Sequence, residues 1–177
     1  MTLVFDQITG TVVVMSKKTV KSAPVLPSFT ASDRLSAHLQ ASLVDITALS
    51  LVAKQIHWNV VGPNFRDLHL NLDEVVDIAR AGSDALAERM RAINVVPDGR
   101  PGTVADKTTV PEAPVAQVIT NEAVDYIVAA IDAVVKTMRA VHDEVDDEDA
   151  VSAGILEDYT QQLEQQGWFL SAQNYTV

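Results

Sequence analysis

Two histidines and three carboxylates occur in one stretch of the sequence at spacings that suit metal binding. They are His57, His69, Asp73, Asp84 and Glu88. Imidazole nitrogens and carboxylate oxygens bind iron, zinc or manganese, and ligand type alone does not choose among these metals. His69 and Glu88 are 19 positions apart, which is about 28 Å along one α-helix. Because metal–ligand bonds are only about 2.0–2.2 Å long, one chain cannot bring all five residues to one ion.

The polar face that carries these residues is nearly palindromic. Positions 69 and 88, 73 and 84, and 77 and 80 are placed symmetrically about a midpoint near 78–79. Two copies packed antiparallel on a two-fold axis at that midpoint would bring the members of each pair face to face. Each of two sites would then take His57, His69 and Asp73 from one chain and Asp84 and Glu88 from the other. The alternative is a solvated charged stripe, as on many surface helices.

His57 and His69 are also expected to converge within one chain. His57 lies six residues before Pro63 and His69 six residues after it. In an antiparallel helical hairpin that turns near Pro63, the two positions come near each other. A lone histidine is more often structural, but two that converge beside a carboxylate indicate ligation.

Apolar residues at helical spacing predict four long helices, over roughly 32–59, 64–94, 117–144 and 149–172. Thr30-Ala-Ser-Asp33 fits a capping box at the start of the first helix, and Pro63 is predicted to open the second. The segment 95–115 contains four prolines and two glycines, which prevent a long helix and allow a short one near 102–108.

The lengths of the connections predict how these helices are arranged. Short links make the first and the last two helices antiparallel hairpins. The long link reaches about 70 Å when extended at ~3.3 Å per residue, which is ample for crossing a bundle. One long crossover is the ferritin-like connectivity. The sequence therefore predicts an all-α, ferritin-like four-helix bundle over 30–177, preceded by a flexible arm over 1–29.

Composition excludes several functional classes. The chain has 177 residues, 47% of them hydrophobic, and no cysteine. Disulfides, zinc–thiolate sites and iron–sulfur clusters are therefore excluded, and a reducing compartment is compatible. The net charge of −11 attracts cations and does not favour nucleic acid. No uninterrupted apolar stretch approaches the ~20 residues of a membrane span, and the N-terminus lacks the order of a signal peptide, so a cytoplasmic protein without membrane association is expected.

The first 28 residues are expected to form a poorly ordered arm. They combine a β-branched run with Lys17, Lys18 and Lys21 and two prolines. Met15 begins MSKKTVKSAPV, which resembles a natural start, so the working protein could begin at Met1 or at Met15.

The motif around the candidate ligands resembles a known family. The chain contains no Glu-x-x-His, so the di-iron site inside an ordinary ferritin bundle is missing. HWNVVGPNFRDLH, followed by SDALAERM and by Trp168-Phe169, is similar to the signature of the Dps family of mini-ferritins, the DNA-binding proteins from starved cells. The resemblance covers roughly residues 30–172, and the motif is long and specific.

This resemblance implies a hollow dodecamer built from two-fold dimers, with a ferroxidase centre for two iron ions at each dimer interface. The family's ligands map onto His57, His69 and Asp73 of one subunit and Asp84 and Glu88 of its mate. The implied reaction oxidises Fe(II) to Fe(III) with hydrogen peroxide, stores the product as mineral inside the shell and limits oxidative damage. Trp58 matches a tryptophan that could trap an oxidising equivalent, although packing at the helix end explains it equally well. Trp168 is expected in the core.

The resemblance also raises the questions of an acidic pore and of DNA binding, for which the sequence gives less support. An acidic corner over 143–149 could contribute to a pore that concentrates Fe(II), or it could be a solvated turn. The arm lysines could contact DNA phosphates. However, the rest of the chain is acidic and the C-terminal SAQNYTV has no basic residue, so weak or no DNA binding is expected.

Two other classes of function remain open. One is a DNA-compacting or structural shell with minor ferroxidase activity. The other is a metal-assisted hydrolase that uses the same ligands to activate water, although no organic substrate pocket is indicated.

Overall fold

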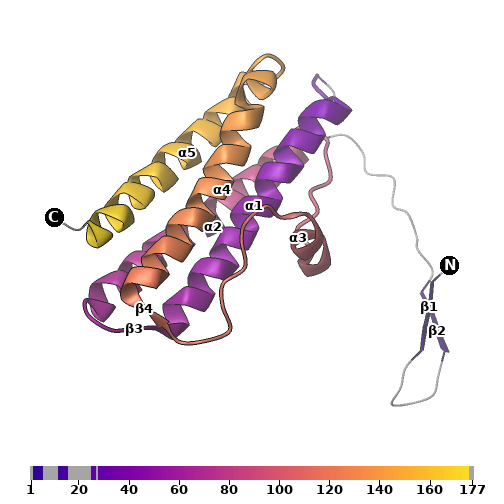
Figure 1. Ribbon diagram of the computed structural model, residues 1–177. Helices are drawn as coiled ribbons and strands as arrows, with labels where there is room; N and C mark the ends of the chain where they lie inside the picture. The colour runs from indigo at the N-terminus through magenta and orange to yellow at the C-terminus, as the bar shows by residue number, and fades with distance from the viewer. Residues whose placement is uncertain (1, 6–11, 16–24, 27, 176–177) are drawn as a thin grey trace.

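Four long helices lie side by side as a bundle in the computed structural model (Figure 1), which describes residues 2–5, 12–15, 25–26 and 28–175. The helices are α1 (Asp33–Asn59), α2 (Phe65–Ala92), α4 (Thr120–Asp146) and α5 (Ala150–Ser171). A short helix, α3 (Pro101–Lys107), lies in the connection between α2 and α4, and a 3-10 turn, η1 (Ala172–Asn174), follows α5. The predicted all-α bundle is confirmed, and the predicted helix ends agree to within one turn.

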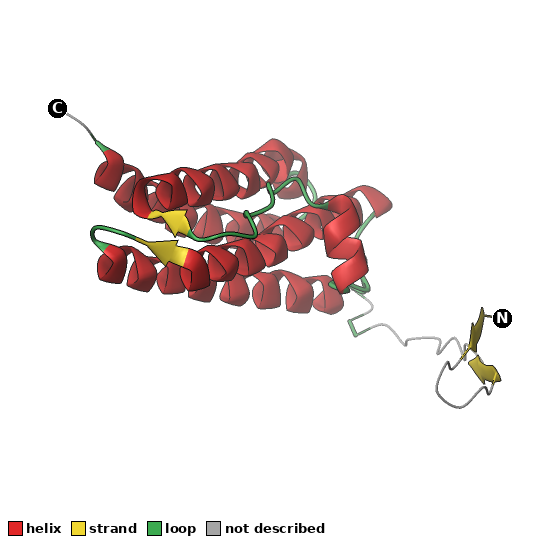
Figure 2. Cartoon of the chain, turned by 60° about the horizontal axis from the view of Figure 1, so that its bottom comes forward, coloured by secondary structure: helices red, strands yellow, loops and turns green. Residues whose placement is uncertain are grey.

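Two pairs of short strands were not anticipated from the sequence. β3 (Val60–Val61) and β4 (Val118–Ile119) pair in parallel at one end of the bundle (Figure 2), joining the residues after α1 to those before α4. β1 (Thr2–Phe5) and β2 (Val12–Met15) form an antiparallel pair where a poorly ordered arm was expected. The arm lysines at 17, 18 and 21 lie outside the described residues, so flexibility of the arm stays a prediction.

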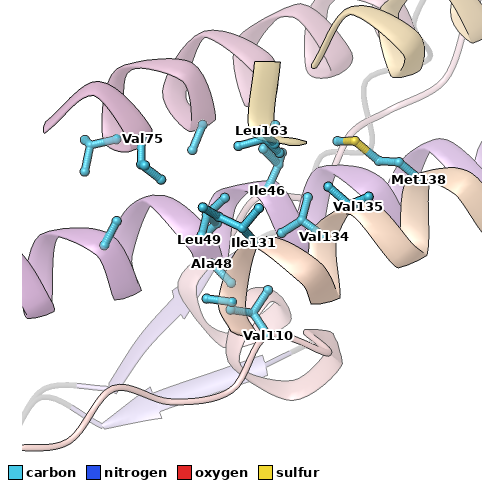
Figure 3. Close-up of a cluster of buried hydrophobic side chains, with 14 of the residues drawn as sticks. Ile46, Ala48, Leu49, Val75, Val110, Ile131, Val134, Val135, Met138 and Leu163 are labelled. Carbon is cyan, nitrogen blue, oxygen red and sulfur yellow. The ribbon is translucent and has the colours of Figure 1, made fainter. Parts of the chain in front are cut away.

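The core runs along the middle of the bundle and uses the helical repeat of apolar residues. In α1 the buried side chains recur every three or four positions, as at Leu39, Ile46 and Leu49. Figure 3 shows Ile46 and Leu49 facing side chains of α4 and α5. Gly82 allows α2 to approach α5 closely. A Cβ at this position would lie 2.9 Å from the Tyr159 ring, which is shorter than an ordinary contact. Burial of these apolar side chains is the main contribution to the free energy of folding, at about 25 cal/mol per Å² of apolar surface.

α1 is the one helix in the described part of the chain that is long and apolar enough to cross a membrane, with a mean hydropathy of 1.3 over its most apolar window. That window is 56% buried inside the bundle. The apolar composition of α1 is therefore accounted for by packing against α2 and α4 in the core.

The start of α1 differs from the predicted capping box. The N-cap is Ser32, whose hydroxyl accepts a hydrogen bond from the Leu35 amide at 3.1 Å. The acid that completes this cap is Glu148, which accepts from the Ser32 amide at 2.8 Å and from its hydroxyl at 2.7 Å. Thr30 and Asp33 do not form the predicted pair, because an acid from the α4–α5 corner already satisfies the N-cap amide.

The start of α2 also differs from the prediction. Pro63 precedes the helix instead of opening it, and Asn64 is the N-cap in the left-handed conformation, with φ of 58°. Asparagine tolerates this region better than most residues, so the turn between α1 and α2 is made by Gly62 (φ 117°) and Asn64 together.

A buried carboxylate fixes the crossover to the bundle. Asp45 is 1% exposed, and no cation pairs with it among the described residues. It accepts four hydrogen bonds of 2.7–2.9 Å, from the Thr108 hydroxyl, the Thr109 amide and hydroxyl, and the Thr137 hydroxyl. Val110, 5% exposed, packs beneath α1 and α4 next to this network (Figure 3). The long connection is therefore held along the bundle by specific contacts.

We expect Asp45→Ala to lower the free energy of unfolding by about 3 kcal/mol, because it leaves an amide and three hydroxyls without their acceptor. Urea unfolding at a fixed protein concentration measures the change. Hydrogen exchange should accelerate in residues 97–118. Asp132→Ala removes an exposed aspartate of α4 and should change stability by less than about 0.5 kcal/mol. Equal effects of the two substitutions would contradict the role given to Asp45.

Candidate metal centre

Three of the five predicted ligands converge at the α1–α2 hairpin. One ligand atom from each of His57, His69 and Asp73 lies within 4.8 Å of the others. His57, near the end of α1, is 7% exposed, whereas the Asp73 side chain, one turn after His69 in α2, is 41% exposed. The cluster therefore has one buried and one open side, which is the arrangement of a site that is completed from outside.

The two histidine rings hold each other in place. Nδ1 of His57 lies 2.9 Å from the His69 carbonyl oxygen, and Nδ1 of His69 lies 3.0 Å from the His57 carbonyl oxygen. The rings stack with centroids 3.6 Å apart and planes inclined by 24°. Because a carbonyl oxygen only accepts, each Nδ1 donates a proton to it, and Nε2 is the nitrogen of each ring that remains for a metal. A hydrogen bond at the far nitrogen is how ligating histidines are usually oriented.

Lys54 lies inside this cluster and is absent from the sequence prediction. Its Nζ donates a hydrogen bond to Asp73 Oδ1 and lies 3.3 Å from Nε2 of His57. This hydrogen bond holds the pKa of the Asp73 carboxyl below its ordinary value; burial opposes the shift, and His57 adds to it. The position of Lys54, one turn before His57 on the same helix, could have revealed it, since residues three apart share a face.

The other two predicted ligands do not reach this cluster within one chain. Asp84 and Glu88 are both exposed on α2, and Asp73 and Asp84 are about 16 Å apart along the helix axis at ~1.5 Å per residue. Within the described part of the chain, no ion pair is made by Asp77, Arg80, Asp84 or Glu88. These four residues of the palindromic face are thus exposed, and their charges are unpaired in the described part of the chain.

Two grooves flank Arg80 on this face. One, of about 400 Å³, is lined by Lys54 and Trp58 beside the cluster. The other, of about 640 Å³, is lined by Asp84. Arg80 lines both grooves. Lys54, next to the cluster, and Asp84 therefore border separate grooves that share Arg80 as a lining residue.

Both tryptophans are exposed, although one of them was predicted to lie in the core. Trp58 is 69% exposed at the end of α1, so packing within the chain does not account for it. Trp168 is 67% exposed, and its predicted place in the core is wrong. The core face of α5 is taken by Leu163, Gln166 and Leu170, and this repeat turns position 168 outward.

Comparisons with known proteins agree with this architecture. A family model described as a ferritin-like domain matches residues 36–175. The chain is 33% identical over 138 residues to a DNA protection during starvation protein of Mycolicibacterium smegmatis, covering 76% of this chain and 73% of that protein. It is also 33% identical over 134 residues to the fine tangled pili major subunit of Haemophilus ducreyi, covering 76% and 71%. Dps from Microbacterium arborescens, solved in a high iron form, superposes with a TM-score of 0.76 at 31% identity over 82% of this chain and 98% of that one.

The bundle and the matching domain model define a protein of the ferritin-like superfamily. Within it, the chain belongs to the Dps family, as its relatives and structural neighbours show. The resemblance drawn from the sequence motif is confirmed. Family membership supports a role in iron storage and protection and a homo-oligomeric state.

The acidic corner between α4 and α5 is largely tied into ion pairs. Glu144 lies 3.4 Å from Arg34, and Asp149 forms a bidentate pair with Arg89 at 2.6 and 2.9 Å. Among the acids of the corner, Asp146 and Asp147 are exposed and make no ion pair in the described chain. Asp146 and Asp147 are therefore the two acids of the corner that are exposed and unpaired in the described chain, while the pore stays a prediction.

At the same end of α4, His142 bridges two acids. It lies 3.0 Å from Asp143 and 2.9 Å from Glu157, and these hydrogen bonds raise its pKa above the ordinary value of 6.5. A raised pKa means that the charged imidazole stabilises the fold below the unfolded-state pKa and loses this effect as the pH rises through the folded-state pKa.

We therefore expect His142→Gln to lower the melting temperature at about pH 5.5 more than at about pH 8.5, because the stabilisation by the charged imidazole declines as the pH rises. Thermal melts of the wild type and the variant at both pH values measure the difference. The other histidines are the same in both proteins, so their titration does not affect the difference between wild type and variant. A loss that is equal or larger at the higher pH would contradict the assignment.

Proposed function

We propose that this chain is the subunit of an iron-storing ferroxidase in which each centre is completed by two subunits. The observation that carries the proposal is the His57–His69–Asp73 cluster, in which two imidazoles and a carboxylate each bring one ligand atom to within 4.8 Å of the others. Nitrogen and carboxylate ligands suit ferrous iron, and carboxylates can bridge two cations and stabilise the ferric state. Iron is here the substrate and the stored product.

The second half of each centre comes, in this proposal, from Asp84 and Glu88 of the two-fold mate. Two features support it: both side chains are exposed on α2, and Asp77 and Arg80, which lie between them and the cluster, make no ion pair in the described part of the chain. Packing two copies of α2 about a midpoint near 78–79 brings Asp77 opposite Arg80 of the mate, which adds a favourable charge pair. The family resemblance supports closure of these dimers into a hollow dodecamer.

The proposed reaction transfers two electrons, one from each of two ferrous ions, to one hydrogen peroxide. The peroxide O–O bond breaks and both oxygens leave at the oxidation level of water, so no hydroxyl radical is released. Hydrolysis of the ferric product gives oxyhydroxide mineral inside the shell and releases protons. A cytoplasmic location and protection from oxidative damage belong to the same proposal.

Complementation between two inactive variants tests the sharing directly. The variant His57→Gln/His69→Gln/Asp73→Asn lacks one half of each centre, and Asp84→Asn/Glu88→Gln lacks the other. Each alone should oxidise Fe(II) with peroxide at near background, as measured by ferric absorbance. Random co-assembly should recover about a quarter of the wild-type rate, because half of the dimers are mixed and each mixed dimer has one intact centre.

Full activity in either variant alone would contradict the shared-centre proposal, and so would two inactive variants that show no recovery on co-assembly. Adding Fe(II) to the purified wild-type protein with and without peroxide, together with metal analysis, separates the ferroxidase from a structural shell and from a hydrolase. A shell predicts no acceleration, and a hydrolase predicts a tightly held metal without iron turnover.

Trp58 is placed in this proposal to take up stray oxidising equivalents. Its exposed ring lies beside His57 and lines the same groove as Lys54. We expect Trp58→Phe to keep the rate of iron oxidation within about twofold and to increase the hydroxyl-radical adducts detected by spin trapping during turnover. Unchanged adduct yield would remove this role, and Trp168→Phe, which alters an exposed tryptophan on α5, serves as the control.

A further inference from the structure

The Lys54 side chain occupies the place where a metal ion would meet two of its ligands. Its Nζ donates to Asp73 Oδ1 and lies 3.3 Å from His57 Nε2, the ring nitrogen that remains for a metal. The Lys54 side chain is 23% exposed, less than the Asp73 side chain at 41%. The ammonium group is therefore drawn into the cluster instead of extending into solvent, as lysines usually do.

An ammonium group and a metal ion cannot use these atoms together. A protonated amine has no lone pair to offer a metal, and a divalent ion bonded to Asp73 and to Nε2 of His57 would fill the position of Nζ. We propose that Lys54 is a built-in counter-ion that competes with the metal, so that loading requires its ammonium group to leave the cluster. This inference rests on the proposed function of the His57–His69–Asp73 centre.

Competition by a tethered cation has a consequence for selectivity. Lys54 belongs to the same helix as His57, so its local concentration at the cluster far exceeds that of free ions. A monovalent ion such as Na⁺ or K⁺ brings no more charge than the ammonium group it would replace. A divalent ion brings twice the charge and forms bonds to both ligands. Lys54 thus excludes abundant monovalent ions while the site still admits Fe(II), at the cost of a weaker affinity.

His69 offers the route by which displacement begins. Among the described residues, no hydrogen bond joins Lys54 to His69, and Nε2 of His69 makes none. An arriving ion can bind this nitrogen before Lys54 has moved, and its charge then repels the ammonium group from Asp73.

The displaced side chain has a place to go. The groove of about 400 Å³ beside the cluster is lined by Lys54 itself, by the apolar Leu51 and Trp58, and by the carboxylate residue Glu112. The flexible lysine stem can lie along the apolar part of this groove. Glu112 gives the ammonium group an acid other than Asp73 to approach.

Calorimetric titration of the iron-free, assembled protein with Zn²⁺ tests the inference, because Zn²⁺ shares the ligand preferences and undergoes no redox reaction. Lys54→Met removes the charge and keeps the length. It should bind the first ion about tenfold to a hundredfold more tightly than the wild type, the range expected for a charged hydrogen bond. Lys54→Arg keeps the charge and should stay near or below wild-type affinity. Lys136→Met, an exposed lysine of α4, should match the wild type.

Equal or weaker binding by Lys54→Met would overturn the inference, since it would show that the ammonium group supports the site or is irrelevant to it. If this variant fails to assemble, Lys54→Gln is judged by the same criterion, because it is neutral and still offers a hydrogen-bond donor. A wild-type protein without any saturable Zn²⁺ site would refute the proposed centre itself. Saturable wild-type binding with unchanged affinity in the neutral variants refutes only the role of Lys54.

Discussion

The rigid rise of α2 is the constraint on which the rest of the molecule depends. A helix cannot fold back to bring Asp84 and Glu88 to His69 and Asp73, so residues with ligand chemistry lie at two separate places on one face. At one end of this face, the α1–α2 hairpin brings His57 next to His69 and Asp73. Nothing comparable covers the other end, where the carboxylates remain exposed. In the proposed function, a complete centre is therefore formed only in an assembly of two or more subunits.

The hairpin can position ligands because its two helices are fixed to each other near the turn. The paired Nδ1–carbonyl hydrogen bonds of His57 and His69 join the helices through the ligands themselves. The β3–β4 pair then ties the same end of the bundle to the start of α4. At the middle of the bundle, Asp45 holds the crossover through its threonine partners. Long-range contacts of this kind stabilise the bundle that carries the exposed candidate metal site.

Sequence reasoning recovered what local periodicity and spacing determine. Helix ends, the long crossover and the convergence of His57 with His69 follow from repeat, proline placement and hairpin geometry. It failed where a partner is distant along the chain. Ser32 is capped by Glu148, 116 positions away, and Asp45 meets threonines 63 to 92 positions away. Neither pairing leaves a local pattern. Trp168 was misplaced because a large aromatic residue suggests burial, whereas the repeat of α5 assigns the core to its neighbours.

The sequence prediction also missed Lys54, and here the reason is chemical, because Lys54 is close to His57 along the chain. A search for metal ligands considers only donors of lone pairs, and a lysine in the same cluster is passed over as a surface charge. Yet a carboxylate held beside two imidazoles is stabilised by a partner, and the ammonium group of Lys54 supplies one to Asp73. With the ammonium group present, the cluster keeps its charge balance before any metal arrives. In the proposed centre, the same ammonium group that pairs with Asp73 opposes metal binding, so the stability of the cluster and its affinity for metal are coupled through one side chain.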